Sequence, residues 1–84
     1  MVKLRKSTHI GSVYSNYGFD AYYLVHADPD EDAPSAKEVE EAVLPNVYLS
    51  GGPGQPFCRS CTAIEKPFSD GYTWIVVAPV RYDV

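Results

Sequence analysis

The chain has 84 residues, a formal net charge of −4 and 45% hydrophobic residues, a fraction that includes seven tyrosines. This length allows a single domain over residues 1–84 with one thin hydrophobic core, and it excludes a two-domain enzyme. The composition argues against a membrane span, a cleaved secretory leader and a disulfide framework. We therefore expect a cytoplasmic protein that does not contact a membrane.

Residues 10–27 have the pattern of two strands joined by a turn. Asn16, Tyr17 and Gly18 form the turn, because Asn and Gly tolerate positive φ angles, and β-branched and aromatic residues dominate on both sides. Alternate residues of a strand share a face. In the second strand one face, which we predict to be the core face, carries Phe19, Ala21, Tyr23, Val25 and Ala27; the other carries Asp20, Tyr22, Leu24 and His26.

An acidic loop and a short helix follow the hairpin. Residues 28–34 contain two prolines and a run of acids, so no regular element is expected there. Ser35 and Glu38 have the spacing of a capping box, which predicts a helix of about nine residues that ends before Pro45. At 100° per residue its apolar arc holds Ala36, Val39, Ala42 and Val43, and the opposite arc is mostly acidic.

The last part of the chain predicts two strands separated by a long connection. Residues 46–50 predict a brief strand, and residues 51–71, rich in Gly and Pro, predict one irregular loop. Residues 72–84 predict the central strand, in which Pro79 marks a bulge or a stretch where the strand becomes an edge. The expected fold class is α+β: a small antiparallel sheet of about four strands (β-β-α-β-β) with one short helix packed on one face.

The sheet of this fold has more surface than the helix can cover. A helix of about nine residues spans roughly 13 Å, so one face of the sheet, with Tyr22 and Leu24, lacks a helical layer. Such a face is an interface for a partner, or for a second copy in a homodimer through the open sheet face, unless residues 51–71 fold over it. The sequence leaves both outcomes open.

Cys58 and Cys61 have the spacing of a zinc or redox pair. A tetrahedral zinc site needs two further ligands, for which the chain offers His9 and His26, on adjacent predicted strands. A redox pair needs its first cysteine at a helix N-terminus that follows a strand, whereas a Gly/Pro-rich loop precedes this pair. The other interpretation is two reduced, partly buried cysteines or an adventitious disulfide. No cofactor is expected, and zinc remains an alternative.

Other motifs point to no catalytic site. The acids from Asp28 to Asp32 resemble the start of a calcium loop, but Ala33 and Val39 stand where such a loop has Gly and Glu. Residues 51–54 are Gly-rich but are not followed by the Lys-Ser/Thr pair of a phosphate-binding loop. We find no nucleophile with a base beside it, so we expect that the chain is not an enzyme.

The expected function is that of a small acidic interaction protein that binds, and inhibits, a larger protein partner with a basic surface. Its carboxylates would meet Arg and Lys side chains of the partner in place of phosphates, and the chain itself would bind no nucleic acid. The predicted partner-binding residues are Asp28, Asp30, Glu31, Asp32, Glu38, Glu40, Glu41, Tyr17, Tyr22 and Leu24.

In size and charge the chain is similar to small phage proteins of the anti-CRISPR and anti-restriction type, which would make it a phage-encoded inhibitor of a nucleic-acid-handling defence complex. Two alternatives belong to other classes. One is a zinc- or redox-active module built on Cys58 and Cys61. The other is a self-assembling structural or accessory subunit of a virion, which would use the open sheet face.

Overall fold

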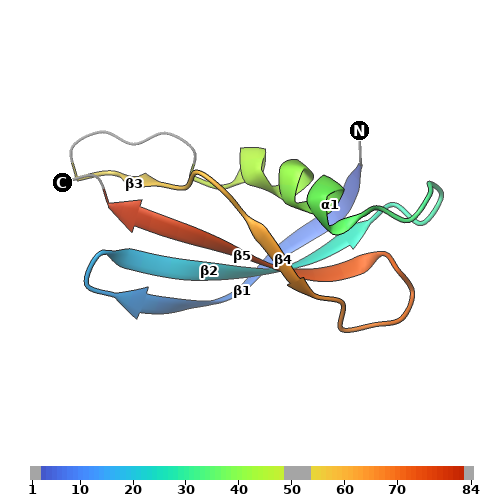
Figure 1. Ribbon diagram of the computed structural model, residues 1–84, viewed down its shortest axis with the longest axis horizontal. Helices are drawn as coiled ribbons and strands as arrows, with labels where there is room; N and C mark the ends of the chain where they lie inside the picture. The colour runs from blue at the N-terminus through green and yellow to red at the C-terminus, as the bar shows by residue number, and fades with distance from the viewer. Residues whose placement is uncertain (1–2, 49–53, 83–84) are drawn as a thin grey trace.

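The computed structural model describes residues 3–48 and 54–82, and in these the chain forms a five-stranded antiparallel sheet with one short helix (Figure 1). The predicted α+β class is confirmed. The molecule is elongated and measures 42 × 22 × 17 Å along its principal axes. In chain order the elements are β1 (Leu4–Ser15), β2 (Gly18–Ala27), α1 (Ala36–Val43), the 3₁₀ turn η1 (Leu44–Asn46), β3 (Pro56–Phe57), β4 (Thr62–Glu65) and β5 (Thr73–Tyr82).

The predicted hairpin is present, and its first strand is longer than predicted. β1 begins at Leu4 rather than at Ile10 and pairs with β2 from Leu4 opposite Ala27 to Ser15 opposite Gly18. The first half of β1 is polar and exposed because β1 lies at the edge of the sheet. A strand in that position needs no apolar alternation, so its beginning could not be recognised from the hydrophobic pattern.

β5 is the central strand, as predicted. β2 pairs with one side of β5, and β3 and β4 pair with opposite ends of its other side. The Tyr82 N–H donates to the Tyr17 carbonyl (3.1 Å), so even-numbered residues of β5 direct their polar groups toward β2. Pro79 therefore faces the interval between β3 and β4, where its missing N–H removes no ladder hydrogen bond. Of the two predicted alternatives, the local edge is the one observed.

α1 begins with the predicted capping box. The Glu38 N–H donates to Ser35 Oγ (3.2 Å), and the Ser35 N–H donates to Glu38 Oε1 (3.1 Å). α1 lies on the predicted core face of β2 (Figure 1) and buries Val39 and Val43 against the sheet. The core consists of Ala21, Val25, Val39, Val43, Cys58, Cys61, Trp74, Val76, Ala78 and Val80.

The predicted strand over residues 46–50 is wrong for the part that the structure describes. Asn46 ends η1, residues 47–48 lie in no strand, and residues 49–50 lie outside the described residues. The Asn46 side-chain amide donates to the Ala42 carbonyl (3.3 Å), which extends the helical end of α1. The proline before Asn46 did not stop the helical conformation, because in the first turn of η1 its missing N–H is not needed.

Residues 51–71 are not one irregular loop, since β3 and β4 lie within them. These strands of two and four residues are too short to show a periodic pattern, and they form because β5 offers a free side to pair with. Cys58 and Cys61, between the two strands, are buried in the core with α1. The described part of this segment, residues 54–71, therefore extends the sheet and packs under the helix.

The face of the sheet away from α1 has no second layer in the described residues. On this face Tyr22 lies opposite Val77 and Leu24 lies opposite Ile75. All four side chains are half-buried, because neighbours on the same face shield one another. We call this surface, made by Tyr22, Leu24, Ile75 and Val77, the open face.

Candidate functional site

The two cysteines are packing residues of the core. Cys58 is 1% exposed and Cys61 is 8% exposed, and neither forms a disulfide. Burial, together with the nearby Cys58 and Glu40, raises the pKa of the Cys61 thiol to about 12, and Cys58 Sγ donates to the Ser60 carbonyl (3.0 Å). A thiol with such a pKa stays protonated at neutral pH, which is unsuited to nucleophilic redox attack.

The two histidines do not approach the cysteines as a ligand set. His9 lies opposite Tyr23, on the side of the sheet that carries α1, and its Nε2 is 2.9 Å from Ser12 Oγ. His26 belongs to the opposite side of the sheet. Residues 3–48 and 54–82 contain no group of three or more His, Cys, Asp or Glu side chains that could hold a metal ion. The predicted zinc ligands are therefore not brought together.

Three of the predicted acidic binding residues are used by the fold. The Asp28 carboxylate accepts from the Asp30 N–H (2.9 Å) and shapes the loop after β2. Glu38 closes the capping box of α1. Glu40 Oε1 accepts from the Ala63 N–H (3.0 Å) and so fixes β4 to the helix. Each of these three carboxylates therefore already accepts a backbone hydrogen bond within the chain.

The remaining predicted acids are exposed and make no side-chain hydrogen bond or ion pair within the described residues. We call this group the acidic surface; it lies on the loop after β2 and on α1 and consists of Asp30, Glu31, Asp32 and Glu41. The loop is held in place: the Glu31 N–H donates to the Asp28 carbonyl (3.2 Å), and the Tyr72 hydroxyl donates to the Glu31 carbonyl (2.9 Å). Three of the four carboxylates of the acidic surface therefore lie on a loop with a defined shape, and the fourth, Glu41, lies on α1.

The basic start of the chain lies beside this loop. The Asp28 N–H donates to the Lys3 carbonyl (3.1 Å), and a shallow hollow is lined by Lys3, Arg5, Asp28 and Asp30 among others. Arg5 and Lys6 form no ion pair within 4.0 Å in the described part of the chain. The sequence did not indicate this proximity, because more than twenty residues separate the two charged segments.

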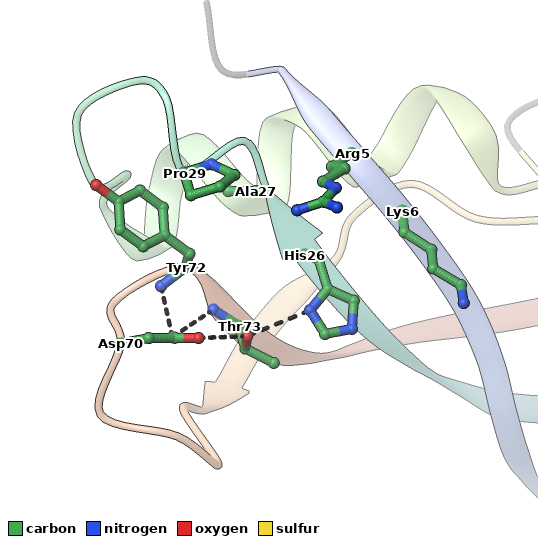
Figure 2. A pocket seen from close by; sticks show the side chains of 8 residues that line it. All are labelled: Arg5, Lys6, His26, Ala27, Pro29, Asp70, Tyr72 and Thr73. Carbon is green, nitrogen blue, oxygen red and sulfur yellow. Dashed lines mark hydrogen bonds between the residues drawn. The ribbon is translucent and has the colours of Figure 1, made fainter.

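A second hollow, which we call the Asp70 pocket, has a volume of about 410 Å³ and opens next to the acidic loop at the end of β2 (Figure 2). Its floor holds a chain of hydrogen bonds: Thr73 Oγ1 donates to Asp70 Oδ2 (2.9 Å), and His26 Nδ1 lies 3.3 Å from the same hydroxyl. The N–H groups of Tyr72 and Thr73 both donate to Asp70 Oδ1 (2.8 and 3.0 Å). The pocket lining is Arg5, Lys6, His26, Ala27, Pro29, Asp70, Tyr72 and Thr73.

Hydrogen bonding sets the chemistry of this pocket. The backbone donor of Tyr72 foremost, then the donors of Thr73 and the charge of His26, lower the pKa of the Asp70 carboxyl despite some desolvation. Because Thr73 Oγ1 donates to Asp70, it accepts from His26 Nδ1–H, and His26 Nε2 has no hydrogen-bond partner among residues 3–48 and 54–82. The Thr73 hydroxyl is buried and engaged, so the arrangement suits the binding of a polar group rather than nucleophilic attack.

The sequence interpretation missed this pocket. Asp70 was placed in a loop and Thr73 at the start of a strand, although an Asp three residues before a Thr with a Gly between them is typical of an Asp-capped turn. That local signal identifies the turn. The approach of His26 from β2 and of Arg5 from β1 depends on the strand registers, which the local pattern does not contain.

The predicted binding residues that are not acidic lie away from the acidic surface. Tyr17, 76% exposed, is at the hairpin turn, at the opposite end of the long axis from the acidic loop (Figure 1). Near it, Phe19 packs against Tyr14 at a ring-centroid distance of 5.4 Å and against Tyr48 and Tyr82 at 6.3 Å each. Tyr22 and Leu24 belong to the open face. The predicted binding residues therefore occupy three separate regions of the molecule.

Comparison of the chain with family models, with curated proteins and with solved structures found no match. No helix of the described residues has the length and apolar character needed to cross a lipid bilayer. The fold and the geometry above are thus the basis for assigning a function.

Proposed function

We propose that this chain is a non-enzymatic protein that binds a basic surface of a larger protein partner through its acidic surface. The observation that carries the proposal is that three exposed carboxylates lie on a loop fixed by internal hydrogen bonds and a fourth, Glu41, lies on α1, and that none of these four side chains forms a hydrogen bond or ion pair within the described residues. A loop that is already ordered loses less conformational entropy when it binds. Carboxylates presented in this way form charge-assisted hydrogen bonds with Arg and Lys.

The partner we propose is a nucleic-acid-handling complex of a host defence system, which the chain would inhibit as a phage protein of the anti-CRISPR or anti-restriction type. Such complexes hold phosphates with clusters of Arg and Lys, and carboxylates presented on an ordered loop compete for the same side chains. The adjacent cations Lys3 and Arg5 would lie at the rim of the contact, where they select against surfaces that are uniformly basic.

A charge reversal tests this proposal. Purified CRISPR effector and restriction complexes are passed over the immobilised chain, and affinity is measured for a complex that is retained. Glu31→Lys should weaken binding at least about tenfold, which corresponds to about 1.4 kcal/mol, and should restore nucleic-acid binding by the complex. Glu65→Lys, an equal charge change on an exposed residue of β4, is the matched control and should leave affinity unchanged.

Two results would count against the proposal. Equal weakening by Glu31→Lys and Glu65→Lys would show that only the net charge matters. If Glu31→Lys left the retention of every complex unchanged, the acidic surface would not be part of the contact. Affinity that falls as salt rises from 50 to 300 mM, about the range over which surface charges become screened, would support it.

A further inference from the structure

β1 is an edge strand that, between Ser7 and Ser15, has a register shift at His9–Gly11 but none of the charges or prolines that usually protect a sheet edge. It is the outermost strand of the sheet order, and with 12 residues it is the longest strand described. From Ser7 to Ser15 it has no Lys, Arg, Asp, Glu or Pro, and Ile10, Val13 and Tyr14 are 51%, 60% and 74% exposed. Natural proteins usually block such an edge with charges, prolines or short strands, because its free backbone groups pair with other strands.

The register shows which backbone groups are free. The Ala27 N–H donates to the Tyr72 carbonyl (2.8 Å), so Ala27 and alternate residues of β2 direct their polar groups toward β5. The β1 residues opposite those positions direct their own N–H and C=O groups away from β2. They include Ser7 opposite Val25, Ser12 opposite Ala21 and Tyr14 opposite Phe19.

We propose that two copies of the chain pair antiparallel along the segment from Ser7 to Tyr14, about a two-fold axis between Ile10 and Gly11 that places Ser7 opposite Tyr14 and His9 opposite Ser12, and form one continuous sheet. Antiparallel pairing of this segment with itself satisfies the outward backbone groups of both copies.

The charges of the chain favour a second copy as the occupant. In this pairing the uncharged segments lie opposite each other, and the basic residues before Ser7 of the two copies are at opposite ends of the interface. Arg5 and Lys6 of one copy then reach the hairpin end of the other, beside the exposed rings of Tyr14 and Tyr17. Cations that lack a carboxylate partner within 4.0 Å in the described residues can stack on these rings.

Light scattering and amide exchange test the proposal on the wild-type chain. The mass should rise with concentration from 9.3 kDa toward twice that value. The amides of Ser12 and Tyr14 should exchange at least about tenfold more slowly at high concentration, because they become hydrogen-bonded only in the dimer. A constant monomer mass, or exchange at these amides that does not depend on concentration, would overturn it.

Two variants separate the edge from the open face. Ser12→Pro deletes an outward N–H without removing a bond to β2, so the variant should keep its folded circular-dichroism spectrum and remain a monomer. Thr62→Lys places a charge at an exposed position opposite Val77 on the open face and should still dimerise. The reverse result, a dimer that survives Ser12→Pro and is lost in Thr62→Lys, would overturn edge pairing. Partner binding through the acidic surface is measured separately with Glu31→Lys.

Discussion

The two halves of the sheet are ordered by different interactions. Under α1, Val25 and Val76 are both 0% exposed, whereas in the hairpin half Val13 is 60% and Tyr14 is 74% exposed. A helix of eight residues spans about 12 Å, while ten residues of strand extend about 33 Å. The helix therefore covers only one end of the core face. Small core side chains such as Ala21 and Val80 stay buried toward the hairpin, but the side chains of Val13, Tyr14 and Tyr17 are exposed there.

The hairpin half relies on the backbone and on ring contacts instead. Gly18 lies directly against the backbone of Val80 in the neighbouring strand. Phe19 packs against the rings of Tyr14, Tyr48 and Tyr82. This contrast teaches that a thin core does not have to stabilise a whole sheet, because strand pairing extends order beyond the helix. It also leaves the hairpin half with the exposed aromatic surface.

The largest effect is expected where the hairpin half depends on backbone proximity. In Gly18→Ala the new Cβ would overlap the Val80 carbonyl, and the φ angle of +153° is one that side chains rarely adopt. We expect a loss of about 3 kcal/mol or more in the free energy of unfolding, measured in urea. Gly11→Ala, with nothing within 4 Å of its Cβ, should change it by less than about 0.5 kcal/mol. Equal effects would contradict this account.

The next-largest effect is expected from a comparison of a buried valine in the helix-covered half with an exposed valine in the hairpin half. Val76→Ala removes two methyl groups from a fully buried site and should cost about 2 to 3 kcal/mol in urea unfolding. Val13→Ala, at an exposed position of β1, should cost less than about 0.5 kcal/mol. If Val13→Ala were as harmful as Val76→Ala at low protein concentration, the hairpin half would have a hidden core of its own.

Sequence patterns predicted the elements in the helix-covered half and missed those that depend on tertiary pairing. The capping box at Ser35, the core face of β2 and the central place of β5 follow from local spacing and apolar alternation, and all three are confirmed. β3 and β4 have no local signal, since they exist because β5 has a free side. The prediction of a strand from residue 46 is wrong over the described residues 46–48 because helical hydrogen bonding continues through η1.

The candidate sites divide in the same way. The acidic surface could be found from composition, but which acids are committed to the fold could not, because the Glu40 contact with Ala63 joins distant segments. The pocket around Asp70 needed the registers of three strands. From the sequence, Cys58, Cys61 and the two histidines formed one alternative set of zinc ligands. In the structure the cysteines are buried in the core and the histidines lie on opposite sides of the sheet.

The smallest effect concerns the Asp70 turn, at the helix-covered end of the sheet, where order depends on a charge rather than on burial. Because hydrogen bonds lower the pKa of Asp70 in the folded state, its ionised form stabilises the fold at every pH above the ordinary carboxyl value of about 3.9. That contribution is lost as the pH falls through the lowered, folded-state pKa. The difference in free energy of unfolding between the wild type and Asp70→Asn should thus be constant above about pH 5 and shrink below about pH 4.

A second variant shows whether the hydrogen bonds, rather than charge in general, produce this pH dependence. Thr73→Val keeps the Asp70 carboxylate and its two backbone donors but removes the hydroxyl donor, so part of the pH dependence should remain. Parallel stability curves for the wild type and Asp70→Asn from pH 2 to 7, about the whole range in which a carboxyl titrates, would contradict the assignment. The turn would then be held by strand pairing rather than by the Asp70 carboxylate.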